Sequence, residues 1–244
     1  MARFQHSHAL GRAIASVAAS VVLTALATDA SAASGALIYV NRCASSCTVM
    51  SGADDAVNGK SSIISGTKVL SAFAQGDAVF SDTVTCLRSV FARYDVQIVT
   101  TNPGTARREM MLAGNATQLG FPSGSGGVAP AGAIKDNAIA FTFANDIGAD
   151  PDTLCWVAAA QLGALYALEP EYRCQDIMGY ATGCGLKTFS DFAAPCGTFA
   201  PVATCPYSGQ PTQNSDALMT ARAGLSDRLF LNEFETPRPS PPAI

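Results

Sequence analysis

The chain has 244 residues, with 15 basic and 19 acidic side chains and a formal net charge of −4 at pH 7. Hydrophobic residues make up 48% of it, enough for a globular domain of this length to bury a sizeable core. The acidic balance and the lack of a basic cluster argue against nucleic acid and anionic membrane as partners, because both bind through concentrated positive charge.

The first 32 residues have the pattern of a secretory signal peptide. Arg3 and Arg12 form a positive start, an alanine-rich apolar run follows, and Ala30-Ser31-Ala32 is a small-residue cleavage site. A retained membrane anchor is the weaker alternative, since the run is short and no stop-transfer charges follow it. We therefore expect residues 1–32 to be removed after Ala32 and the protein to be secreted or periplasmic.

Cleavage would leave the mature chain without histidine, because His6 and His8 are the only two. Ser-His-Asp and Cys-His catalysis are therefore excluded in the mature protein. Serine-lysine catalysis stays formally open, because the mature chain keeps Lys60, Lys68, Lys135 and Lys187. Carboxylate pairs for glycoside hydrolysis can be far apart along a chain, so the sequence neither supports nor excludes them.

All eight cysteines lie after the predicted signal peptide, and an even number in an exported chain predicts a disulfide framework. A thiolate zinc site is the alternative, but it needs two close C-x-x-C pairs, which the sequence lacks. Local spacing favours pairing Cys43 with Cys47, and Cys155 with Cys174 at the two ends of one helical segment, while other pairings stay open. The disulfide candidates are Cys43, Cys47, Cys86, Cys155, Cys174, Cys184, Cys196 and Cys205.

The mature chain starts with an apolar, β-branched run at 36–40 that predicts a buried strand. Residues 51–76 are rich in serine, glycine and aspartate, and we expect an irregular excursion there. Apolar residues then recur at helical spacing over 77–94, and Asp77 is expected to cap this helix.

Three further strands and a loop are expected in the middle of the chain. Strands are predicted at 96–99 and 109–113, where β-branched and apolar residues cluster. Residues 120–132 are dominated by glycine, proline and serine and predict a loop on a surface or rim. The alternating run 138–144 predicts a strand of good quality.

The clearest helix start in the chain follows that strand. Asp150 is a suitable N-cap, Pro151 takes the first helical position and Asp152 adds negative charge to the first turn. These aspartates, with Asp146, could instead bind calcium, but turn and cap chemistry accounts for them without a metal.

A last helix is expected over 213–225, and the proline-rich end, 236–244, is predicted to be disordered. The order of strands and helices predicts one α/β (α+β) domain at 33–235, with a mixed sheet and a disulfide-rich C-terminal part.

In the segment 160–180, Met178 and Tyr180 stand in a turn shortly after the predicted helix, and in this the segment resembles the active site of a metzincin zinc metallopeptidase. That family carries H-E-x-x-H-x-x-G-x-x-H, followed by a turn with methionine. Two histidines one helical turn apart and a third after the glycine bind zinc, while the glutamate acts as general base. Here Met178 and Tyr180 match the Met-turn, and the short, matrixin-like interval before it puts the third ligand position at Pro170.

By this resemblance the rest of the motif falls on Ala160, Gln161, Ala164 and Ala167. Ala160, Ala164 and Pro170 offer no donor atom to a metal, and Gln161 has the shape of the family's glutamate without its basicity. Ala167 replaces a glycine and is strained if its φ is positive. The resemblance implies a metzincin-like mixed twisted sheet with an active-site-type helix and a Met-turn, but with no catalytic residue, zinc or other cofactor.

We therefore expect a pseudopeptidase that binds an extended peptide or a protein, with the strand of Phe141 and Phe143 as the sheet edge that a peptide would join. Two alternatives stay open. Glu169, Glu171 and Asp176 could hold a metal in an active hydrolase, although carboxylates alone suit calcium or magnesium better than zinc. Otherwise the protein could be a structural component of an envelope or an extracellular matrix.

Overall fold

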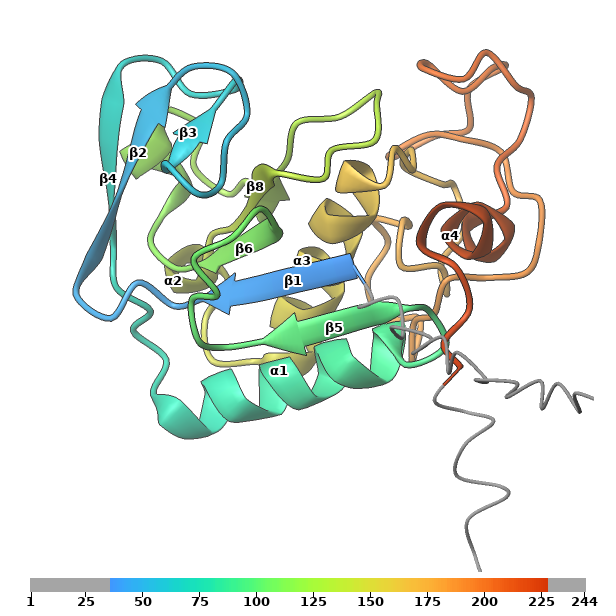
Figure 1. The fold of residues 1–244 in the computed structure, drawn as a ribbon. Coiled ribbons are helices and arrows are strands. Elements are labelled where there is room, and N and C mark those ends of the chain that lie inside the picture. The colour runs from blue at the N-terminus through green and yellow to red at the C-terminus, as the bar shows by residue number, and fades with distance from the viewer. Residues whose placement is uncertain (1–35, 228–244) are drawn as a thin grey trace, which may run out of the picture. The chain divides into compact units, whose positions relative to one another are not determined.

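The computed structural model describes residues 36–227, so the predicted signal peptide and the proline-rich end lie outside the described residues. Within this range, two mixed β-sheets and four α-helices form an α+β fold (Figure 1). None of the described helices is long and apolar enough to cross a membrane.

The larger sheet has the strand order β5-β1-β6-β8-β7. Its strands are β1 (Ala36–Asn41), β5 (Val96–Val99), β6 (Arg108–Leu112), β7 (Gly127–Val128) and β8 (Ala138–Thr142). The first three and β8 run parallel, close to the ranges that the sequence predicts, while β7 is antiparallel to β8. The stretch 120–132, predicted to be a loop, thus contributes the last strand of the sheet.

The prediction that the strand of Phe141 and Phe143 forms a sheet edge is wrong. β8 pairs with β6 on one side and β7 on the other, and both phenylalanines are fully buried. Phe143 follows the last residue of β8. A two-residue strand in a glycine-rich stretch has no hydrophobic alternation by which to recognise it. Its presence makes β7 the edge of the described sheet on that side.

Both faces of the larger sheet are covered, and β6 and β8 are buried along their whole length. On one face, α1 (Asp77–Phe91) and α3 (Pro151–Leu165) pack against each other and the sheet (Figure 1). The smaller sheet covers the other face, with Val49 and Leu70 against Phe141. The remaining helices are α2 (Ala144–Ile147), α4 (Ser215–Ala223) and a 3-10 helix at Ala116–Leu119.

The excursion at 51–76 is more regular than predicted, because most of the smaller sheet lies in it. This sheet has the order β3-β2-β4, with β2 (Ser46–Ser51), β3 (Lys60–Ser61) and β4 (Thr67–Ser71). Serine, threonine and lysine dominate these strands, and such residues give a weak strand signal on their own. Packing of a few apolar side chains against the larger sheet decides the structure instead.

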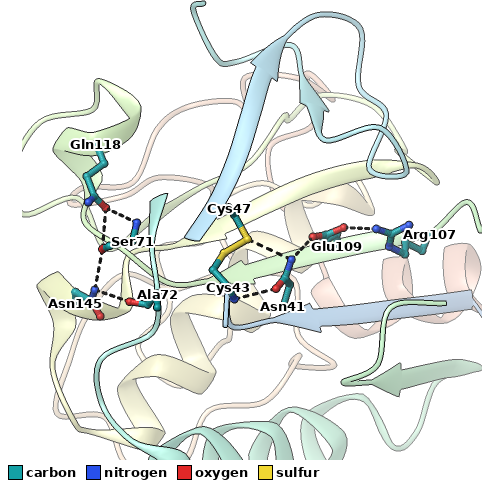
Figure 2. The surroundings of a disulfide bond; sticks show 9 residues. All are labelled: Asn41, Cys43, Cys47, Ser71, Ala72, Arg107, Glu109, Gln118 and Asn145. Carbon is teal, nitrogen blue, oxygen red and sulfur yellow. Dashed lines mark hydrogen bonds and ion pairs between the residues drawn. A yellow bond between two sulfur atoms is a disulfide. The ribbon is translucent and has the colours of Figure 1, made fainter. Parts of the chain in front are cut away.

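Figure 2 shows how β1 leads into the smaller sheet through the disulfide between Cys43 and Cys47. Asn41, the last residue of β1, donates to the sulfur of Cys47 at 3.4 Å and to the carboxylate of Glu109 at 2.8 Å. Glu109 pairs in turn with Arg107 at 2.6 Å, and each of these two side chains is only 3% exposed. Removing one partner would leave a buried charge, so the pair fixes this junction.

The helix starts confirm one prediction and correct another. Asp150 is the N-cap of α3, as predicted, and Pro151 is its first residue. Gly76, not Asp77, is the N-cap of α1, and Asp77 pairs with Arg42 without capping the helix.

The eight cysteines form four disulfides, which fit a protein of an oxidising compartment. The predicted pairing of Cys43 with Cys47 is confirmed, but that of Cys155 with Cys174 is wrong. The pairs are Cys43–Cys47, Cys86–Cys155, Cys174–Cys184 and Cys196–Cys205. Cys155 lies on the side of α3 that packs against α1, which brings it to Cys86.

Removing the Cys86–Cys155 bond should destabilise the protein more than removing Cys43–Cys47, because the sequence separations are 69 and 4. In the chain-entropy model the two closures contribute about 4 and about 2 kcal/mol. We expect the variant C86A/C155A to unfold at a clearly lower temperature than C43A/C47A in non-reducing calorimetry. Equal shifts relative to the unmodified protein would contradict this expectation.

Candidate functional site

Two adjoining pockets form a cleft between β7, α3 and the irregular chain that follows α3. The large pocket has a volume of about 640 Å³ and the small pocket about 240 Å³. Gly127, Ala160, Gln161 and Tyr180 line both, so the two pockets are continuous.

The small pocket brings together four of the five motif positions named above. Ala160, Gln161, Ala164 and Pro170 all line it. Ala160 and Gln161 each lie about one helical turn before Ala164 on the same side of α3, and the chain turns back after the helix to bring in Pro170. Two methyl groups and a pyrrolidine ring therefore stand where the resemblance has imidazoles.

The chain leaves α3 through a left-handed residue at the remaining motif position. Ala167 has a φ of +62°. The N–H of Leu168 donates to the carbonyl of Gly163 and that of Ala167 to the carbonyl of Ala164, at 3.1 and 2.9 Å. This is a Schellman motif, whose left-handed position glycine usually occupies. Alanine at this position is strained by its Cβ.

Met178 lies directly beneath α3. It is buried, and a Cβ on Gly163 would approach its sulfur to 2.7 Å, so the missing side chain at 163 allows this contact. Met178 also lines the small pocket. Tyr180 is exposed on the cleft wall, where its ring packs edge-on against Phe199 with 6.1 Å between ring centres.

A buried carboxylate holds the Met178 turn in place. Asp176 accepts hydrogen bonds from the N–H of Met178 at 2.7 Å, the N–H of Ser190 at 2.9 Å and the hydroxyl of Ser215 at 2.6 Å. Ser190 belongs to a later loop and Ser215 begins α4. One side chain thus ties three segments together beside the cleft.

The other two carboxylates considered as metal ligands are also engaged elsewhere. Glu169 accepts from the N–H groups of Tyr207 and Ser208, each at 2.8 Å, and Glu171 from the amide of Gln213 at 3.0 Å. Neither lines either pocket, and neither does Asp176.

Among the described residues, the cluster closest to metal-ligand geometry is Glu169 with Cys196 and Cys205. The two sulfurs are joined in a disulfide, and the metal ligand of cysteine is the free thiolate. This arrangement gives no support to a carboxylate-bound metal.

Two of the three aspartates considered for calcium serve as caps. Asp146 accepts from the N–H of Ala116 at 2.7 Å, at the start of the 3-10 helix, and Asp150 accepts from the N–H of Asp152 at 3.2 Å. Cap chemistry accounts for both.

Glycine allows the edge strand β7 to lie close to α3. A Cβ on Gly127 would lie 2.6 Å from the carbonyl oxygen of Phe141 and 2.8 Å from Cγ of Gln161. Gly126 accepts from the N–H of Phe143, at 2.9 Å. Because hydrogen bonds alternate in direction along an antiparallel strand, Gly127 directs its own N–H and C=O away from β8.

Gln161 is 8% exposed and its amide hydrogen-bonds to no described residue, so it is available to a ligand. Sequence reasoning missed the edge strand, because a two-residue strand in a glycine-rich stretch gives no recognisable strand signal.

Comparison of the chain with protein families, with characterised proteins and with solved structures found no match.

Substitution by glycine should have opposite effects on stability at the strained Ala167 and at Ala160, a helical position that lines the cleft. Ala167→Gly removes a Cβ from a left-handed residue and should stabilise the fold by about 0.5–1 kcal/mol. Ala160→Gly lies within α3 and should destabilise it by about 1 kcal/mol. Urea denaturation of both variants measures the change in the free energy of unfolding, and a loss of stability in Ala167→Gly would contradict the strained turn.

Glu171 should make stability depend on pH. Its Oε2 is buried without a hydrogen-bond partner, and burial together with the neighbouring charge of Asp176 raises the pKa of Glu171 from 4.5 to about 8. The folded state therefore keeps a proton that the unfolded chain releases. The stabilisation is fully present below pH 4.5 and is lost as the pH rises through 8.

Glu171→Gln should flatten this dependence, and at pH 8.5 the variant should melt at a higher temperature than the unmodified protein. Thermal denaturation at pH 5 and 8.5 measures it, with the exposed Asp82→Asn as the control. An unchanged pH slope in Glu171→Gln would rule out this titration.

Proposed function

We propose that the protein is a secreted or periplasmic, catalytically inactive metzincin-like domain that binds an extended segment of a peptide or protein in its cleft. The small pocket carries the proposal. Positions with the spacing of the zinc motif line it above Met178, and they present two alanines, a proline and an amide. The disulfides and the predicted signal peptide support the location.

The path of the chain supports the metzincin-like part of the proposal. α3 follows an interior strand of a mixed sheet, ends in a left-handed turn at Ala167 and is followed by the turn of Met178 beneath it. This is the order that the resemblance implies, and the left-handed turn falls at the family's glycine. Alanine disfavours the left-handed backbone conformation, so the residue type at position 167 does not itself explain the turn.

The chemistry of the cleft favours binding over catalysis. Gln161 can donate and accept hydrogen bonds but cannot act as a base at neutral pH. Trp156, Tyr180 and Phe199 provide aromatic walls in the large pocket. A peptide added to β7 would bond to the outward backbone groups of Gly127, and its side chains would alternate between the cleft and solvent.

Restoring the absent ligands tests the origin of the small pocket. The variant A160H/A164H/P170H should hold about one zinc ion per chain, because three imidazoles suffice for a protein zinc site with one open position. The unmodified protein should hold less than stoichiometric zinc and leave unfolded protein substrates intact. Metal analysis after dialysis and a casein cleavage assay measure both.

The matched control, A160H/A164H/K60H, has the same number of histidines but places the third at position 60, away from the small pocket. Lys60 is exposed on β3. A folded A160H/A164H/P170H variant with no more zinc than this control would reject the metzincin-like assignment. Chelator-sensitive cleavage by the unmodified protein would show that the protein is an active metallopeptidase and would reject the proposal that it is catalytically inactive.

A further inference from the structure

The lining of the large pocket includes a cationic side chain. Among the described residues that line either pocket, Lys187 is the only lysine or arginine, and it is 6% exposed. Its Nζ donates to the carbonyl oxygens of Gly179 at 2.5 Å and Asp176 at 3.4 Å. Within the described range, no carboxylate oxygen lies within ion-pair distance of it.

This environment leaves Lys187 incompletely satisfied. An ammonium group has three donors, and two carbonyls take two of them. Carbonyls are dipoles and carry no compensating charge, so burial lowers the pKa of Lys187, although the nearby charge of Asp176 acts in the opposite direction. A carboxylate that entered the pocket would supply a third acceptor and a countercharge in one group.

The rest of the large pocket fits the body of a side chain that ends in such a group. Its aromatic lining includes Phe199, which is 86% exposed. Among the described residues of the lining, Asp150 is the one carboxylate, and its oxygens already accept from the N–H of Asp152 and the hydroxyl of Thr153. A volume of about 640 Å³ leaves ample room for one amino-acid side chain.

We infer that the large pocket takes an aspartate or glutamate side chain of the bound peptide, with its carboxylate on the Nζ of Lys187. The inference rests on the proposed function and names the class of peptide that the cleft selects.

The chain's single tryptophan provides a local signal for the test, because Trp156 lines the large pocket. The probes are four mixtures of N-acetylated, C-amidated heptapeptides with randomised flanks and a central Glu, Gln, Leu or Lys. Titrations followed by tryptophan emission should give the Glu mixture about ten-fold tighter binding than the Gln mixture, as a charge-assisted hydrogen bond allows. The comparison uses the unmodified protein and does not depend on any variant folding.

Three variants then assign the preference to one residue. Lys187→Met should bring the Glu and Gln mixtures to similar affinity, and Lys187→Arg, which keeps the charge, should retain part of the preference. Lys60→Met removes an exposed lysine on β3 and should change nothing. Circular dichroism establishes that each variant is folded.

Each outcome separates the inference from the proposed function. Equal binding of the Glu and Gln mixtures would overturn the inference and leave peptide binding intact, whereas no binding of any mixture would overturn the proposed function. A preference that survives in folded Lys187→Met would reject the role of Lys187. A Gln mixture with a free C-terminus that binds as tightly as the amidated Glu mixture would assign the pocket to a terminal carboxylate and reject the side-chain assignment.

Discussion

The cleft depends on how the chain satisfies its backbone after α3. No helix and only isolated bridges occur between α3 and α4, so buried N–H groups there need side-chain partners. Asp176 bonds the turn of Met178 to a later loop and to α4, and Glu169 bonds the N–H groups of Tyr207 and Ser208. The positions of Met178 and of the loop beyond it, and hence one side of both pockets, follow from these hydrogen bonds.

The same carboxylate also sets the charge of its surroundings. Asp176 helps to raise the pKa of Glu171, so that Glu171 is largely protonated at neutral pH, and it opposes the effect of burial on Lys187. Of these two buried acids, Glu171 is thus held neutral, while Asp176 accepts three hydrogen bonds. This division keeps the interior behind the cleft from accumulating negative charge, and it leaves Lys187 as the cation that faces the large pocket.

Much of the larger sheet and both long helices could be predicted from the sequence, because apolar periodicity over five or more residues reports which side of an element is buried. The grouping of Ala160, Gln161 and Ala164 also follows from helical period alone. The edge strand β7, the smaller sheet and the Cys86–Cys155 bond could not be predicted. Each depends on contacts between distant segments, and local residue patterns do not record which distant partner is chosen.

One property of the small pocket affects how a ligand would bind there. On the sides formed by β7 and α3, its lining includes Gly127, Ala129, Ala160 and Ala164, and Pro170 follows the helix. None of these residues has a rotatable side chain to be ordered, so this surface loses little conformational entropy when a ligand arrives. The shape of this surface is a property of the backbone, and selectivity there will come from steric fit to it. Adaptable contacts come from the side chains with rotatable bonds in the same lining, which are Val128, Gln161, Leu168, Met178, Tyr180 and Tyr207.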